Sequence, residues 1–218
     1  MPGTRRHIMK IEIFSDFTCP FCYIGKTKLA NAIEKVELDE APNMIFRKYE
    51  IHPEIEGSID IPYKDYMLDM MGGNQRKLDE FLEELTAHAK EVGLDFNFDT
   101  MIGANTADAH RLGKWVASEN LDQQYTDLLM KAHFTDGKDL SDRNFLYTVI
   151  EQIGLSKEIA KEVLEEDKFA YELEMDQYAA QQIGVESAPF FVFDNRFGII
   201  GVEPEEVFTR TLKQVTGN

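Results

Sequence analysis

The sequence of 218 residues has little cysteine, a shortage of basic charge and no long hydrophobic run. Its two cysteines are too few for a disulfide-stabilised scaffold. Acidic side chains outnumber basic ones by 40 to 23, and a formal net charge of −17 is unlike the basic surface that nucleic-acid binding requires. No stretch approaches the roughly 20 consecutive apolar residues of a membrane-spanning helix. We therefore expect a chain that folds around its own core and binds neither nucleic acid nor membrane.

The start of the chain is basic but does not continue into an apolar segment. The basic run within residues 1–8 is followed at once by the charged residues Lys10 and Glu12, which is not the pattern of a secretory signal. We interpret residues 1–8 as an added leader, with Met9 as the natural start. We therefore expect a cytoplasmic protein, and in a reducing compartment paired cysteines are more often catalytic or metal-binding than structural.

The spacing of the two cysteines is the informative feature of this sequence. Cys19 and Cys22 form a C-x-x-C motif, and two cysteines in a chain of this length fall at that spacing by chance about once in a hundred cases. A zinc site would need two further ligands, but there is no other cysteine and no H-x-x-x-H pairing among the histidines. Inert cysteines buried on a helix face are a second alternative. Thiol–disulfide chemistry is the favoured interpretation.

The residues around the motif predict a helix that follows a strand. Residues 10–15 alternate between apolar and polar side chains, and apolar residues recur at helical spacing from Cys22 onward. Pro20 suits the first turn of a helix. Cys19 would then lie beside unpaired N–H groups at the positive end of the helix dipole, so we expect a thiolate with a lowered pKa. Cys22, one turn further on the buried face, is the expected resolving thiol.

The rest of the chain divides into a second strand, a long helical stretch and a C-terminal hairpin with a helix. Between residues 61 and 168 only helical patterns occur, with clear amphipathic helices over 78–92 and 141–154. The hairpin turn is expected at Asp194 and Asn195. The predicted strands cover residues 43–51, 187–193 and 197–201, and the last helix covers residues 203–215.

This order of elements resembles the thioredoxin fold. Three motifs are similar to those of the DsbA family, and most closely to its FrnE-like branch. They are CPFCYIGK at 19–26, NTADAHRL at 105–112 and APFFVF at 188–193. The resemblance covers nearly all of residues 9–214. It implies an α/β protein with a discontinuous thioredoxin domain (residues 9–61 and 169–218) and an inserted all-helical domain (residues 62–168) that caps the active-site face.

The resemblance also implies roles for individual residues. Cys19 is the attacking thiol, Cys22 is the resolving thiol, and Pro189, preceded by Ala188, is a cis-proline that faces the cysteines. From its position alone, Pro189 has the alternative of an ordinary edge-strand proline. Ala188 departs from the bulkier residue that is common at this position in the family, which leaves the substrate preference open.

Further residues are candidates for substrate binding. They are Pro20, Phe21, Ala188, Asn105, His110 and Arg111. His110 and Arg111 come early in a helix that is expected to be capped near Asn105 or Thr106. If that helix faces Cys19, the two cations would stabilise a thiolate or hold the carboxylate of glutathione. A surface salt bridge and a satisfied histidine are the alternative.

The sequence predicts a thiol–disulfide oxidoreductase that exchanges disulfides with protein or small-molecule thiols, as a monomer or a homodimer. No metal, nucleotide or flavin cofactor is expected, since no Gly-rich phosphate loop follows a strand, although glutathione remains a candidate co-substrate. One alternative is a glutathione-dependent isomerase or transferase of the 2-hydroxychromene-2-carboxylate isomerase or kappa glutathione transferase type. In those families a serine commonly matches Cys19 and no second cysteine is required. A non-catalytic peptide binder is a third possibility.

Overall fold

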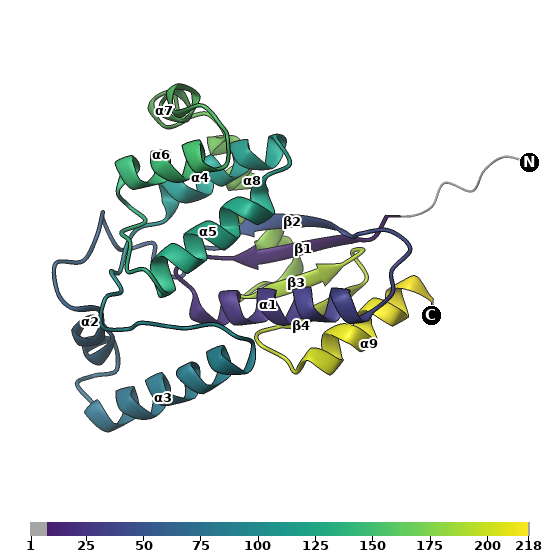
Figure 1. Ribbon diagram of the computed structural model, residues 1–218, viewed down its shortest axis with the longest axis horizontal. Helices are drawn as coiled ribbons and strands as arrows, with labels where there is room; N and C mark the ends of the chain where they lie inside the picture. The colour runs from purple at the N-terminus through teal and green to yellow at the C-terminus, as the bar shows by residue number, and fades with distance from the viewer. Residues whose placement is uncertain (1–7, 218) are drawn as a thin grey trace, which may run out of the picture.

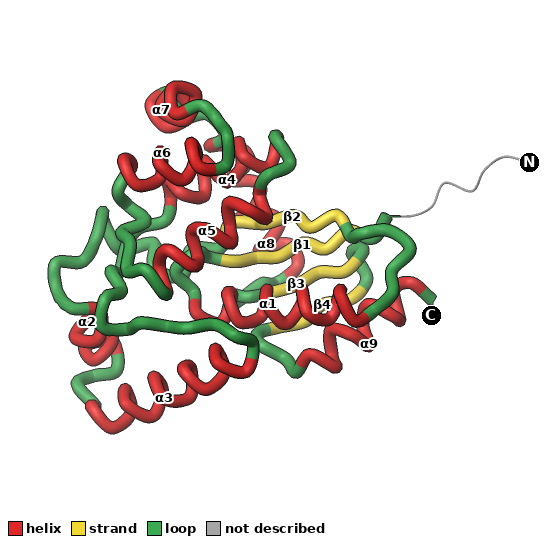
Figure 2. Tube along the Cα trace, in the orientation of Figure 1, coloured by secondary structure: helices red, strands yellow, loops and turns green. Residues whose placement is uncertain are grey.

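A mixed sheet lies at the centre of the protein, with helices on both faces (Figures 1 and 2). The computed structural model describes residues 8–217, so the predicted leader lies outside the described residues except for Ile8. The four strands within this range are β1 (Lys10–Ser15), β2 (Asn43–Lys48), β3 (Phe190–Phe193) and β4 (Phe197–Ile200). Their order is β2-β1-β3-β4, with β1 parallel to β2 and antiparallel to β3. This confirms the predicted α/β thioredoxin fold.

Alternate side chains of β1 pack on opposite faces of the sheet. Helices α1 (Pro20–Lys35), α8 (Ala170–Ile183) and α9 (Glu205–Thr216) cover these faces. Ile11 and Ile13 belong to the same buried cluster as Leu29 of α1 and Leu212 of α9. Phe14 packs on the other face with residues of α8 and β3. The alternation in the sequence therefore corresponds to a strand that is buried on both sides.

The hairpin between β3 and β4 turns at the residues expected from the sequence. Asp194 and Asn195 have φ angles of +49° and +55°, and they are the central residues of a turn in which the Arg196 amide donates to the Phe193 carbonyl over 2.9 Å. A turn with two left-handed central residues matches the twist of the strands that it connects. The observed strand β3 begins at Phe190 and is therefore shorter than the strand predicted at residues 187–193. Pro189 has no N–H to offer to a neighbouring strand, so regular pairing starts after it.

The stretch between β2 and α8 is helical, as expected, and all of its residues are described. Its helices are α2 (Tyr63–Met70), α3 (Gln75–Glu91), α4 (Ala107–Ser118), α5 (Asp122–Phe134), α6 (Arg143–Gln152) and α7 (Lys157–Glu165). The predicted helices over 78–92 and 141–154 correspond to α3 and α6. Gly93 and Gly154, with φ angles of +77° and +85°, follow their ends. Across residues 8–217, none of the helices has the length and apolar character needed to cross a bilayer.

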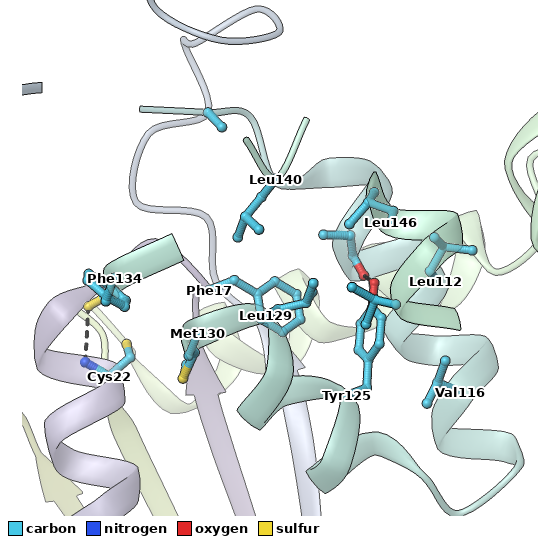
Figure 3. Packing of buried hydrophobic residues seen from close by; sticks show 14 of the residues in the cluster. Phe17, Cys22, Leu112, Val116, Tyr125, Leu129, Met130, Phe134, Leu140 and Leu146 are labelled. Atoms are coloured by element: carbon cyan, nitrogen blue, oxygen red, sulfur yellow. Dashed lines mark hydrogen bonds between the residues drawn. The ribbon is translucent and has the colours of Figure 1, made fainter. Parts of the chain in front are cut away.

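A single buried cluster connects the first turn of α1 with the inserted helices. Cys22 lies in it together with Phe17, and Leu129 and Phe134 of α5 pack in the same cluster (Figure 3). In Figure 1 the inserted helices gather around the end of the sheet where β1 ends and α1 begins. The core therefore continues from one predicted domain into the other, and the boundaries at residues 61 and 168 stay predictions.

Candidate active site

The two cysteines lie at the start of α1. Cys19 is the N-cap residue, and Pro20 occupies the first helical position, where a missing N–H has no intrahelical partner to lose. The amide nitrogen of Cys22 donates a hydrogen bond to Cys19 Sγ over 3.3 Å. Both cysteines are free thiols, with exposed fractions of 3% and 1%. The fold thus holds two thiols one helical turn apart and shields them from water.

The loop before β3 lies against the Cys19 side chain. The Ala188–Pro189 peptide bond is cis, and the carbonyl oxygen of Ala188 accepts from Cys19 Sγ at 3.8 Å. Gly25 allows this loop to approach α1, because a Cβ atom there would lie 3.2 Å from Pro189 Cγ and 3.1 Å from the ring of Phe191. The absence of a side chain at Gly25 therefore brings the cis-proline loop and the dithiol helix close together.

The electrostatic surroundings of Cys19 differ from the expectation. Burial raises the pKa of the Cys19 thiol well above its ordinary value, and the neighbouring Cys22 thiol and Asp16 carboxylate act in the same direction. The hydrogen bond from the Cys22 amide opposes them. The predicted lowering of the Cys19 pKa is therefore wrong for this arrangement. Removing the sulfur from water disfavours the thiolate more than the helix N-terminus favours it.

A buried acid–base pair lies next to the first turn of α1. Asp16 precedes Cys19 by three residues, and its backbone carbonyl accepts from the Cys19 amide at 3.3 Å. Nε2 of His110, on α4, lies 3.2 Å from Asp16 Oδ1, and the Ile51 amide donates to Asp16 Oδ2 over 2.8 Å. Burial raises the pKa of Asp16, but the hydrogen bond and charge of His110, with the bonds from Ile51 and Thr106, outweigh burial and hold this pKa below its usual range.

Other predicted binding residues have different surroundings. Phe21, between the cysteines, meets Phe81 of α3 edge to face with ring centroids 6.2 Å apart, so an inserted helix contacts the motif. The guanidinium of Arg111 bonds to Asp167 in the segment between α7 and α8. This bond agrees with the surface salt bridge that was the alternative role for Arg111.

Asn105 is involved in holding the start of α4. Its Oδ1 accepts from the Ala107 amide at 2.9 Å, and its Nδ2 donates to the Ile55 carbonyl over 2.8 Å. Thr106 is the N-cap residue but makes no side-chain cap bond. Asn105 therefore ties the helix that carries His110 to the segment after β2.

Sequence reasoning missed three buried groups near the dithiol: Asp16, Tyr63 and His133. His133 on α5 is completely buried, and neither of its ring nitrogens has a hydrogen-bond partner among residues 8–217. Tyr63 of α2 meets this ring edge to face, with centroids 6.4 Å apart. Burial lowers the pKa of His133 to about 4. Asp16 could have been found from the sequence, because it is an acidic residue only three positions before Cys19. No sequence pattern around Tyr63 or His133 points to the site.

Comparison with known proteins places this geometry in a family. A family model described as a DSBA-like thioredoxin domain matches residues 10–213. The chain is similar to the crystal structure of a probable DsbA oxidoreductase, SCO1869, from Streptomyces coelicolor. The two share 28% identity and a TM-score of 0.89, over 96% of this chain and 91% of the other.

Two more distant solved structures share the fold. A 2-hydroxychromene-2-carboxylate isomerase has 14% identity and a TM-score of 0.68, with 95% of this chain and 98% of the other covered. The cytosolic disulfide reductase DsbM from Pseudomonas aeruginosa with GSH has 13% identity and a TM-score of 0.64, with 96% and 100% covered. At these identities the likeness concerns the fold alone. The family match, in contrast, spans both cysteines, the cis-proline loop and all four described strands. The chain therefore belongs to the family of DSBA-like thioredoxin domains.

Proposed function

We propose that this protein is a thiol–disulfide oxidoreductase in which Cys19 attacks and Cys22 resolves. The observation that carries the proposal is the start of α1, where the Cys22 amide donates to Cys19 Sγ over 3.3 Å and both residues are free thiols. The cis-proline loop, whose Ala188 carbonyl lies 3.8 Å from Cys19 Sγ, supports the same chemistry. Membership of the DSBA-like family agrees with this assignment.

The proposed exchange proceeds in two steps. The Cys19 thiolate attacks one sulfur of a substrate disulfide, so that a new S–S bond forms, the substrate S–S bond breaks and the second substrate sulfur leaves as a thiolate that takes up a proton. The Cys22 thiolate then attacks Cys19 Sγ, forms the Cys19–Cys22 disulfide and releases the first substrate sulfur as a second thiol. The substrate gains two electrons and the dithiol loses two. The reverse sequence oxidises a substrate dithiol.

The closed arrangement keeps the thiols unreactive until a substrate arrives. Cys19 is 3% exposed, and burial raises its pKa. Tyr63 of α2 is buried nearby, and its own pKa is raised by burial and then by the charge of Cys19. A substrate disulfide therefore reaches Cys19 after the covering side chains move. The same movement admits water, which favours the thiolate.

The substrates we propose are protein or small-molecule thiols and disulfides, with glutathione as a candidate co-substrate. Pro20, Phe21 and Ala188 are the residues that would meet them. The chain shares its fold with DsbM, a protein described as cytosolic and as solved with GSH, and a cytoplasmic site of action for this chain is part of the proposal. Assignment to the FrnE-like branch, and a monomeric or homodimeric state, stay predictions.

Reduction of insulin by dithiothreitol tests the proposed function. Cys19→Ser and Cys22→Ser should each abolish turnover, because each removes one of the two required steps. Cys22→Ser should in addition accumulate a mixed disulfide with glutathione at Cys19, visible by mass spectrometry and removed by dithiothreitol. Thermal unfolding of each variant checks that the fold is retained.

Two outcomes would contradict the proposal. Full activity of Cys22→Ser would favour the isomerase or transferase alternative, in which the second cysteine is dispensable. A dithiol that never cycles in glutathione buffers would favour the peptide binder.

A further inference from the structure

The inserted helices bring a titratable side chain into contact with the segment that carries the dithiol. His110 is on α4, 94 positions from Asp16, and the two side chains have exposed fractions of 8% and 2%. The ring of His110 also packs on Phe17, with centroids 4.6 Å apart, and Phe17 meets Tyr125 edge to face. The imidazole is thereby held against Asp16 by aromatic packing as well as by the 3.2 Å hydrogen bond.

Asp16 is close enough to the dithiol for its charge to matter. Its backbone carbonyl accepts from the Cys19 amide, so the two residues occupy one turn of the chain. Its carboxylate, held ionised by His110, Ile51 and Thr106, disfavours a second negative charge on Cys19. Both side chains are buried, and charges that are removed from water interact far more strongly than charges in water.

We propose that His110 is a positioning residue for disulfide exchange, which acts through Asp16 by offsetting the carboxylate charge that opposes the Cys19 thiolate. Its importance for exchange rests on the proposed function, whereas its effect on thiol titration does not. The helical insertion would then supply part of the chemistry of the dithiol, in addition to covering it.

The other charged or titratable groups around Asp16 and His110 either bond to a different carboxylate or lie elsewhere in the same cavity or on the next helix. Arg47 and Lys114 line the same small cavity as Asp16 and His110, but both bond to Asp176. The remaining titratable groups that line this cavity are Lys48, Asp122 and Tyr125. His133, on the next helix, is buried and neutral near pH 7. Among these titratable groups, His110 is the one that bonds directly to the Asp16 carboxylate.

The test measures the pH dependence of Cys19 alkylation by iodoacetamide in a Cys22→Ser background, which leaves one thiol and needs no turnover. Asp16→Asn removes the opposing carboxylate, and the midpoint of the pH–rate profile should fall by about one pH unit, a tenfold change in the thiolate equilibrium. His110→Gln keeps a nitrogen donor near the position of Nε2 but cannot carry a charge. Its midpoint should rise. In the Asp16→Asn background, His110→Gln should cause no further change.

Asp176→Asn is the matched control, because Asp176 is an equally buried carboxylate with basic partners. It should lose stability without moving the alkylation midpoint. The inference is overturned if Asp16→Asn and His110→Gln leave the midpoint unchanged, if Asp176→Asn moves it as much as Asp16→Asn does, or if the effect of His110→Gln persists without Asp16.

A second readout separates this inference from the proposed function. With both cysteines present, and at a pH above the alkylation midpoint of Cys19, Asp16→Asn should shift the equilibrium with glutathione toward the dithiol by up to about tenfold, because a more stable thiolate stabilises the reduced form. If alkylation midpoints move as expected but the wild-type pair does not cycle, the charge coupling stands and the proposed exchange function fails.

Discussion

Two buried carboxylates, Asp16 and Asp176, have different kinds of partner. Asp176 on α8 bonds to the guanidinium of Arg47 over 2.9 Å and to the ammonium of Lys114, so its partners come from β2 and α4. Asp16, beside the dithiol, bonds to His110. Arginine and lysine stay charged over the ordinary pH range, whereas histidine is the side chain that changes charge near neutrality. The comparison indicates a link between distant elements at Asp176 and a carboxylate–imidazole pair beside the dithiol at Asp16.

The Asp176 network is the larger of the two and joins more of the fold. Arg47 also bonds to Glu12 on β1 over 2.6 Å, so the network connects two strands of the sheet with α4 and α8. The inserted helices are thereby attached to the sheet on the face opposite α1. We expect this region to serve stability and the Asp16 region to serve chemistry.

The largest expected effect is the loss of stability in Asp176→Ala. Removing the carboxylate takes away the acidic partner of Lys114 and leaves Arg47 with Glu12, and breaking a buried pair in this way costs about 3 kcal/mol or more. Urea unfolding followed by circular dichroism measures the change. Insulin reduction at a temperature where the variant is folded should remain near the wild-type rate. A large loss of turnover with little loss of stability would reverse the roles assigned to the two regions.

The second effect is a pH dependence of the unfolding free energy that comes from His133, the buried histidine near the dithiol. Burial lowers the pKa of His133 to about 4 from an ordinary value near 6.5, so the unfolded chain binds a proton more readily than the folded one. Stability should therefore fall as pH decreases from about 6.5 to 4, by about 3 kcal/mol in total.

Comparison of the wild type with His133→Leu isolates this contribution. Urea midpoints measured between pH 7 and 4 should decline less steeply in the variant, because the buried imidazole is gone. Parallel declines in the two proteins would contradict the assignment to His133.

The smallest effect concerns the contact between α1 and the cis-proline loop. A Cβ atom at Gly25 would lie 3.1 to 3.2 Å from Phe191 and Pro189, so Gly25→Ala should displace the cis-proline loop. The strain of this displacement should cancel the stability of about 1 kcal/mol that alanine usually adds in a helix. The displaced loop should also lower the rate of insulin reduction several-fold. Gly113→Ala on α4 is the control, since its nearest neighbour would lie at an ordinary 3.5 Å. The control should be more stable and equally active. If Gly25→Ala and Gly113→Ala have equal stability and equal activity, the close contact between α1 and the cis-proline loop is not important for either property.

Local sequence signals were sufficient for much of the fold. The predicted strand at residues 10–15 agrees with β1, because alternation reports a pleated backbone directly, and the turn at Asp194 and Asn195 needs residues that tolerate positive φ. The boundaries of the other strands were less accurate. The strand predicted to end at residue 51 ends at Lys48, since pairing with β1 stops where β1 stops.

The candidate site was predictable only in part, because it is made of segments far apart in the chain. The residues around the C-x-x-C motif placed Cys19 and Cys22 at the start of a helix, which the structure shows. The expected lowering of the Cys19 pKa was wrong, because the helix N-terminus is a local feature and the burial that outweighs it depends on the fold around it.

The sequence by itself determined the order of strands and helices, the two-cysteine motif at a helix start and the family of the chain. Each of these depends on residues that are neighbours along the backbone. The tertiary structure decided how deeply Cys19 is buried and which partners Asp16 and Asp176 receive. It also decided that the ring nitrogens of His133 have no hydrogen-bond partner in the described part of the chain. Burial and charge pairing depend on distances between segments that the sequence separates, so folding alone settles the electrostatics of the dithiol.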